Sequence, residues 1–89
     1  MTEYETRGTE IRGLAKSLVL QFMQRTPECK PGKKGLKLAQ IFRMCGFDWG
    51  EYEKATSSHQ QYWVVALARE LEAEGKIERD AESKHWRIK

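Results

Sequence analysis

The sequence has little cysteine, little proline and no long apolar run. Of its 89 residues, two are cysteine and two are proline, and no stretch approaches the roughly 20 apolar residues that a membrane-spanning helix needs. A secreted domain of this size usually carries more cysteines than Cys29 and Cys45. The N-terminal residues also lack the basic-then-apolar order of a signal peptide. These absences predict a cytoplasmic protein that does not contact a membrane.

Residue patterns for catalysis and for metal or cofactor binding are also missing. A zinc site built from Cys29, Cys45, His59 and His85 would lack the close ligand pairs of tetrahedral zinc sites. Ser58 and its neighbour His59 diverge by about 100° on a helix, so they do not form a nucleophile and base pair by themselves. The run GKKG at 32–35 lacks the length and the ending of a phosphate-binding loop. We therefore expect no enzyme activity, no metal and no cofactor.

The composition is that of one small globular domain. Hydrophobic residues make up 39% and charged residues 33% of the chain, which favours neither disorder nor a membrane protein. No internal repeat or low-complexity run divides the sequence. We expect a flexible N-terminal arm at 1–9 and a single domain at 10–89.

The last third of the chain changes its apolar period at Gly75. Before it, apolar residues recur at three- and four-residue steps and predict a helix over 56–74, with Thr56 and Ser57 as available N-caps and one face towards the core: Val64, Leu67, Ala68 and Leu71. After it, Trp86 and Ile88 alternate with polar residues, which predicts strands near 76–79 and 84–88 with these two side chains over the core. Gly75 itself is expected to end the helix in a left-handed conformation.

Two shorter helices are predicted in the first half. The first covers 10–25, with Thr9 as its N-cap and Pro27 as its stop, and its core face is expected to carry Ile11, Leu14, Ala15, Leu18, Phe22 and Met23. A loop with two prolines and two glycines follows at 27–35. The second helix covers 37–45 and ends at Gly46. A brief strand at Leu36 is expected to pair with the C-terminal hairpin.

The order of these parts resembles a known superfamily. The run from Val64 to Arg79, VVALARELEAEGKIER, followed by HWRI at 85–88, is similar to the recognition helix and wing of winged helix-turn-helix DNA-binding domains. More distantly, it is similar to the winged-helix domains that accompany some restriction endonucleases. The resemblance implies an α+β fold, with three helices followed by a two-stranded C-terminal wing, and binding of double-stranded DNA. The 46–55 connection is longer than the turn of the simplest helix-turn-helix.

The charge is polarised along the chain although the net charge is only +3. The segment 30–45 has five bases and no acid, and 83–89 has three bases and no acid, whereas 70–82 has six acids and two bases. Two basic clusters that flank a polar helix start are the electrostatic pattern of a groove-binding protein. The acidic second half of the helix would repel phosphates, so its N-terminal end is expected to face DNA.

The candidate contacts follow from this arrangement. Small polar or flanking side chains near the start of the 56–74 helix are candidates for reading base edges: Ser58, His59, Gln61, Tyr62 and Val65. Basic side chains of the helix, the loop and the hairpin are candidates for phosphate contacts: Lys30, Lys33, Lys34, Lys37, Arg69, Lys84, His85 and Arg87.

Double-stranded DNA is thus the expected partner of a small transcriptional regulator or accessory protein, associated with the nucleoid if the source is bacterial or archaeal. A homodimer through the first helix or the N-terminal arm is compatible with two-fold operators. The alternative is a winged helix used for protein contacts. Its interface would be the aromatic segment 47–52 or the acidic ridge 70–82.

Overall fold

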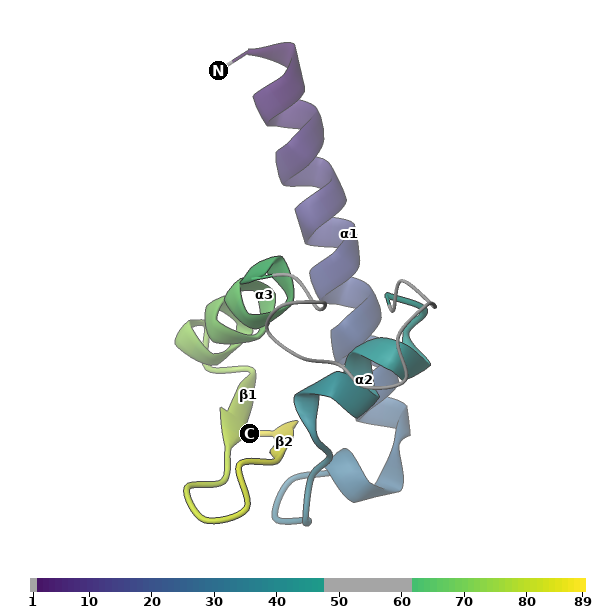
Figure 1. Cartoon of the computed structure of the whole chain (residues 1–89), viewed down its shortest axis with the longest axis vertical. Helices are drawn as coiled ribbons and strands as arrows, with labels where there is room; N and C mark the ends of the chain where they lie inside the picture. Colours follow the sequence, from purple (N-terminus) through teal and green to yellow (C-terminus); the bar gives the residue numbers. More distant parts are fainter. Residues whose placement is uncertain (1, 48–61) are drawn as a thin grey trace.

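The other described elements pack against the C-terminal half of a long N-terminal helix (Figure 1). The computed structural model describes residues 2–47 and 62–89, and of Tyr62 and Trp63 the backbone alone. Along the chain come α1 (Glu3–Arg25), a 3-10 turn η1 (Pro27–Cys29), α2 (Leu38–Met44), α3 (Tyr62–Ala73), β1 (Ile77–Arg79) and β2 (Trp86–Ile88). The fold is therefore α+β, with three described α-helices and a C-terminal antiparallel hairpin, as the sequence predicts.

The first helix begins seven residues earlier than expected. Thr2 is its N-cap: the Thr2 hydroxyl accepts from Glu5 N, and the Glu5 carboxylate accepts from Thr2 N. This reciprocal capping box satisfies two otherwise unpaired backbone donors. Thr9, expected as the cap, lies inside the helix, where its hydroxyl donates to Glu5 O at 2.9 Å. The start at residue 10 was therefore wrong, and from Glu3 onward the expected arm is part of α1.

The core face of α1 also differs from the expectation. Val19 and Met23 are fully buried, and Ala15 and Phe22 pack against the core. Ile11, Leu14 and Leu18 are exposed instead. Among the apolar residues of this helix, Val19 and Met23 are thus buried by the described elements, whereas Ile11, Leu14 and Leu18 remain exposed.

The core lies where all the described elements meet. Phe42 and Ile41 of α2 pack with Leu67, Ala68 and Leu71 of α3, and the hairpin adds Ile77 and Trp86. Burying one such side chain contributes about 1.5–3 kcal/mol. Ile88 is half-buried against this cluster, which confirms that Trp86 and Ile88 lie over the core.

Glycines end two helices as predicted. Gly46 (φ 77°) and Gly75 (φ 76°) are both left-handed. After α3, Gly75 N donates to Glu72 O at 2.9 Å and Lys76 N donates to Leu71 O at 3.1 Å. The backbone N–H groups of Gly46 and Phe47 make the same two hydrogen bonds after α2. These are Schellman motifs, which satisfy the last helical carbonyls. The expected N-caps of the third helix, Thr56 and Ser57, lie outside the described residues.

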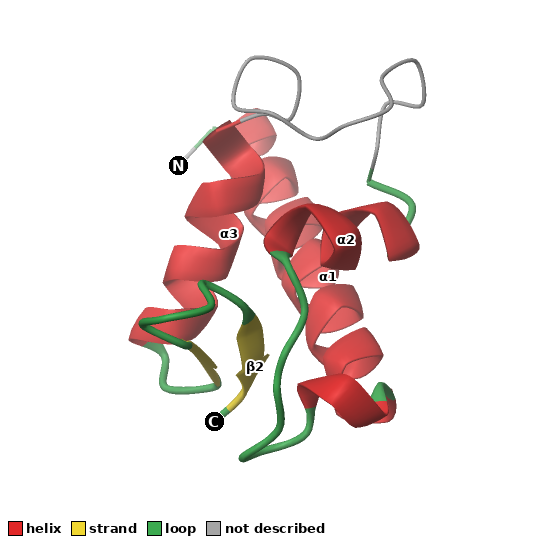
Figure 2. Ribbon diagram, turned by 60° about the horizontal axis from the view of Figure 1, so that its bottom comes forward, coloured by secondary structure: helices red, strands yellow, loops and turns green. Residues whose placement is uncertain are grey.

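The hairpin pairs Ile77 with Ile88, Glu78 with Arg87 and Arg79 with Trp86. Its strands are shorter than predicted, because Lys84 and His85 belong to the turn: Asp80 N donates to His85 O and Lys84 N donates to Asp80 O. Leu36 forms an isolated antiparallel bridge with Trp86. The brief strand expected at Leu36 is therefore confirmed, and it attaches the preceding loop to the hairpin (Figure 2).

Candidate nucleic-acid interface

The residues 30–37, called here the basic loop, are held against the hairpin by backbone contacts. Leu36 N donates to Trp86 O at 3.0 Å, and Trp86 N donates to Leu36 O at 2.8 Å. Gly35 (φ 80°) precedes this bridge, and an added Cβ there would lie 2.6 Å from Trp86 O. The close approach therefore requires glycine, and it fixes the basic loop beside β2.

The four lysines of the basic loop are exposed and available. Lys30, Lys33, Lys34 and Lys37 all lie on the surface. None of them forms an ion pair with any residue in the described ranges 2–47 and 62–89. Four unpaired cations on one ordered loop form a positive surface that an anionic polymer can bind.

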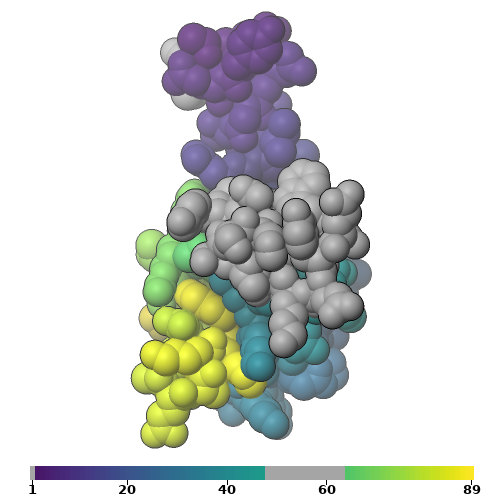
Figure 3. All heavy atoms as spheres, in the orientation of Figure 1, coloured from purple at the N-terminus to yellow at the C-terminus, as the bar shows by residue number. Residues whose placement is uncertain are grey.

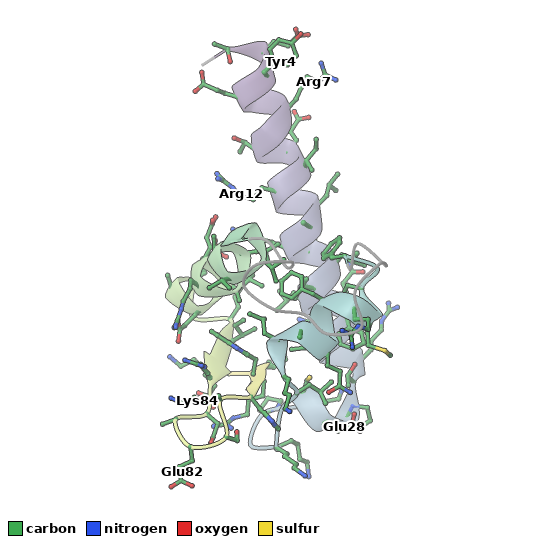
Figure 4. All side chains as sticks on the ribbon, in the orientation of Figure 1. Tyr4, Arg7, Arg12, Glu28, Glu82 and Lys84 are labelled. Atoms are coloured by element: carbon green, nitrogen blue, oxygen red, sulfur yellow. The ribbon has the colours of Figure 1, made fainter. Side chains whose placement is uncertain are left out.

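The wing, defined here as residues 77–88, presents a tight turn built around Asp80. One carboxylate oxygen of Asp80 accepts from Ser83 N at 2.7 Å and from Glu82 N at 3.1 Å. These hydrogen bonds, that of Ser83 first, hold the pKa of Asp80 below its usual range. Lys84 follows in a left-handed conformation (φ 67°) and is exposed. Figure 4 shows Lys84 and Glu82 at the turn, pointing outward.

His85 is placed differently from the other basic candidates. Its side chain is half-buried, and its Nδ1 atom is buried and has no hydrogen-bond partner among the described residues. Its Cβ atom lies 3.2 Å from the position of a Cβ built on Gly35. His85 therefore lies where the wing and the basic loop meet.

Arg87 connects the two strands and the basic loop. Its guanidinium donates to Glu78 at 2.7 Å, to Asp80 at 3.5 Å and to the Lys33 carbonyl at 3.4 Å. Its pKa is raised, mainly by the hydrogen bond to Glu78. Only 20% of the side chain is exposed. The structure therefore places this predicted phosphate contact in an internal network that holds the wing against the loop.

The outer face of α3 adjoins the wing through Arg69. Its guanidinium lies 5.6 Å from the centroid of the Trp86 ring, and it donates to Glu72 at 3.0 Å. Arg79 of β1 lies over the same ring at 6.0 Å. Val65, one turn before Arg69, is 46% exposed. A surface thus runs from Val65 past Arg69 to the wing.

Arg79 was missed among the sequence candidates. Its position is set by the register, because the residue opposite it on β2 is Trp86. A guanidinium over an aromatic face is favourable and stays hydrated on its open side. Arg79 can be identified as part of the basic surface only from the pairing of β1 with β2, because the sequence alone does not fix the register of the two strands.

Most of the base-reading candidates lie outside the described residues. This applies to Ser58, His59 and Gln61, and only the backbone of Tyr62 is described. Of the aromatic segment proposed for protein contacts, Phe47 alone is described; its ring packs on Phe42 with the centroids 5.7 Å apart. Among these candidates, exposure is therefore established for Val65.

The acidic ridge is largely neutralised within the chain. Lys16 of α1 pairs with Glu70 and Glu74, and Arg69 and Arg87 pair with three further acids: Glu72, Glu78 and Asp80. Of the six acids in 70–82, Glu82 alone makes no ion pair with a described residue. The unpaired charge on this end of the described surface is therefore mainly positive.

Among the described residues, no helix is long and apolar enough to cross a membrane. No group of three or more histidine, cysteine or acidic side chains in these ranges lies close enough to hold a metal ion. Compared with known protein families, curated proteins and solved structures, the chain gives no match.

Proposed function

We propose that this protein binds double-stranded DNA as a winged helix-turn-helix domain. The first turns of α3 enter the major groove, and the basic loop and the wing contact the phosphate backbone. A major groove about 12 Å wide admits one helix, whose N-terminal residues reach base edges. The role would be that of a transcriptional regulator or an accessory DNA-binding protein.

The observation that carries this proposal is the attachment of the basic loop to the wing. The Leu36–Trp86 bridge joins the end of the basic loop to the wing. With it, Lys30, Lys33, Lys34 and Lys37 are held next to the hairpin that follows α3. Phosphate contacts fix the position of a protein on a duplex, and an ordered cluster of cations beside a helix supplies them.

The layout supports the proposal in a second way. Arg69 and Arg79 lie over Trp86, so basic groups continue from the wing onto the outer face of α3. Arg69 is exposed although it pairs with Glu72, and an exposed ion pair contributes little to stability. A phosphate can therefore compete for Arg69 at low energetic cost.

The test is a titration of a fluorescently labelled duplex, followed by anisotropy at several salt concentrations. We expect Lys34→Gln to weaken binding to all duplexes alike and to reduce the slope of log K against log salt by about 0.9. Lys76→Gln is the matched control, because it removes one exposed positive charge that already pairs with Glu74. It should leave the slope unchanged. Absence of duplex binding at low salt, or equal effects of the two variants, would contradict the proposal.

A further inference from the structure

Four apolar side chains are exposed along one face of α1, where Ile11 borders α3 and Leu18 borders α2. Tyr4 is 76% exposed, Ile11 66%, Leu14 71% and Leu18 43%. Figure 3 shows the N-terminal end of α1 standing clear of the other described elements. Single exposed apolar residues are common, but four on one helix face form a patch that marks an interaction surface.

The spacing of these four side chains is that of a helix seam. Tyr4, Ile11 and Leu18 follow each other at seven-residue steps, and Leu14 occupies the intermediate position. Tyr4, Ile11 and Leu18 are the a positions of a heptad repeat and Leu14 is the central d position, while Arg7 and Gln21 occupy the outer d positions. The a and d positions lie along one side of a helix and pack against another helix. The core-facing residues Val19 and Met23 lie on a different face. The seam is therefore additional to the intramolecular packing of α1.

The projecting part of α1 also needs support. An isolated helix shorter than about 12–15 residues is marginal in water, and Gly8 and Gly13 each weaken this one by about 1 kcal/mol relative to alanine. Packing of a second helix on the seam would provide that support. This supports a helix as the partner, since a helix fits a heptad seam along its whole length.

The distribution of charge along α1 favours α1 of a second copy of the chain as the partner helix, packed antiparallel. From Glu3 to Glu10, three acids and Arg7 give a side-chain net charge of −2; from Ile11 to Arg25 three bases and no acid give +3. Lys16 and Arg12 already pair with Glu70 of α3, which leaves Arg25 as the base of this half without an ion pair among the described residues. Antiparallel packing places the acidic end of each helix against the basic end of the other, whereas parallel packing places like charges together.

The register that pairs Ile11 with Leu14 of the second copy fits the rest of the surface. It places Tyr4 of that copy opposite Gln21, which together with Leu18 and Met44 lines a groove of about 440 Å³ between α1 and α2. Met44 is exposed there, and a thioether beside an aromatic ring is a favourable contact. Glu3 of the second copy would then lie near Arg25.

We infer that the chain forms a homodimer through an antiparallel pairing of the exposed α1 seams. The dimer leaves the wing free, because the projecting end of α1 lies at the opposite end of the molecule (Figure 1). This inference does not rest on the proposed function, since the seam and the basic loop are separate surfaces.

Sedimentation velocity of the full chain across micromolar concentrations tests the dimer. We expect the wild type to dimerise and Leu14→Asp to raise the dissociation constant by at least about a hundredfold, because a symmetric dimer loses two buried leucines. Thr9→Asp is the control, as it introduces the same charge off the seam. Circular dichroism confirms that both variants keep their helices. A monomeric wild type, or a Leu14→Asp variant as dimeric as the control, would overturn the inference.

Cysteine cross-linking tests the orientation. Mild oxidation of mixed Ile11→Cys and Leu14→Cys chains should give disulfides mainly between the two different variants. Burial raises the pKa of Cys45 to about 11 and that of Cys29 above its ordinary value, so the native thiols compete poorly. Disulfides mainly between identical variants would indicate parallel helices and would overturn the antiparallel pairing.

Discussion

Leu36 and Trp86 exchange two backbone hydrogen bonds, of 3.0 and 2.8 Å, although 50 residues separate them in the sequence. This pair joins the basic loop to the wing. The same Trp86 packs in the core and carries the guanidinium groups of Arg69 and Arg79 on its ring. One residue thus links the core, the loop and the basic face of α3.

The bridge predicts different effects of alanine at two left-handed glycines of the basic loop. Gly35→Ala should destabilise the fold by about 2 kcal/mol or more, because backbone strain adds to the clash with Trp86 O. Gly32 (φ 76°) has open space around it, so Gly32→Ala should cost only about 1 kcal/mol. Urea denaturation followed by circular dichroism measures both. Equal losses would show that the loop does not depend on its contact with β2.

The ion pairs between α1 and α3 predict a dependence of stability on pH. The hydrogen bond from Lys16 holds the pKa of Glu74 below its usual range. A carboxyl with a lowered pKa in the folded state stabilises the protein above its unfolded pKa and loses that contribution as the pH falls through the folded value. Lys16→Met should therefore show a smaller loss of stability than the wild type as the pH falls below about 5.

The hydrogen bonds to Glu70 and then Glu74 raise the pKa of Lys16 itself. Its contribution is thus complete at neutral pH and is lost only when the pH rises through that raised pKa. The matched control for Lys16→Met is Lys34→Met, because Lys34 pairs with no acid in the described ranges. Its pH profile should run parallel to that of the wild type in urea denaturation. Parallel profiles for all three proteins would show that the Lys16 pairs contribute nothing.

The pairing of Arg69 with Glu72 predicts that removing the acid strengthens DNA binding. Glu72→Gln frees the guanidinium beside the wing and removes a repulsive charge, so duplex affinity should rise severalfold at low salt. Glu74→Gln removes the same charge just after the end of α3, where it leaves Lys16 paired with Glu70 and removes the acid partner of Lys76. Its effect in the anisotropy titration should be smaller. A larger effect of Glu74→Gln would place the DNA on the other side of α3.

The sequence alone predicts the fold well where local chemistry decides the structure. The change of period at Gly75 identifies the hairpin, and left-handed glycines end α2 and α3. The pattern of Thr2 followed by Glu5 was also readable as a capping box. Gly8 does not end the helix, because a helix tolerates an interior glycine at a cost of about 1 kcal/mol.

Contacts between distant elements were not predictable in the same way. Ile11, Leu14 and Leu18 have the spacing of a buried face, but spacing does not tell whether the covering surface belongs to the same chain. Arg87 was expected to contact phosphate, and only the register shows that it lies opposite Glu78. Charge clusters in a sequence therefore locate a basic surface, whereas the pairing of each cation depends on the fold.

The most direct test of the account is an NMR titration of the isotope-labelled chain with a short duplex. We predict that amide signals of the basic loop, the wing turn and the exposed face of α3 around Val65 shift together and saturate at one stoichiometry. Signals from Tyr4 to Arg7 should stay in place, because the N-terminal end of α1 projects at the opposite end of the molecule from the wing. Absence of shifts at low salt, or shifts confined to α1, would contradict DNA binding through the wing and the basic loop.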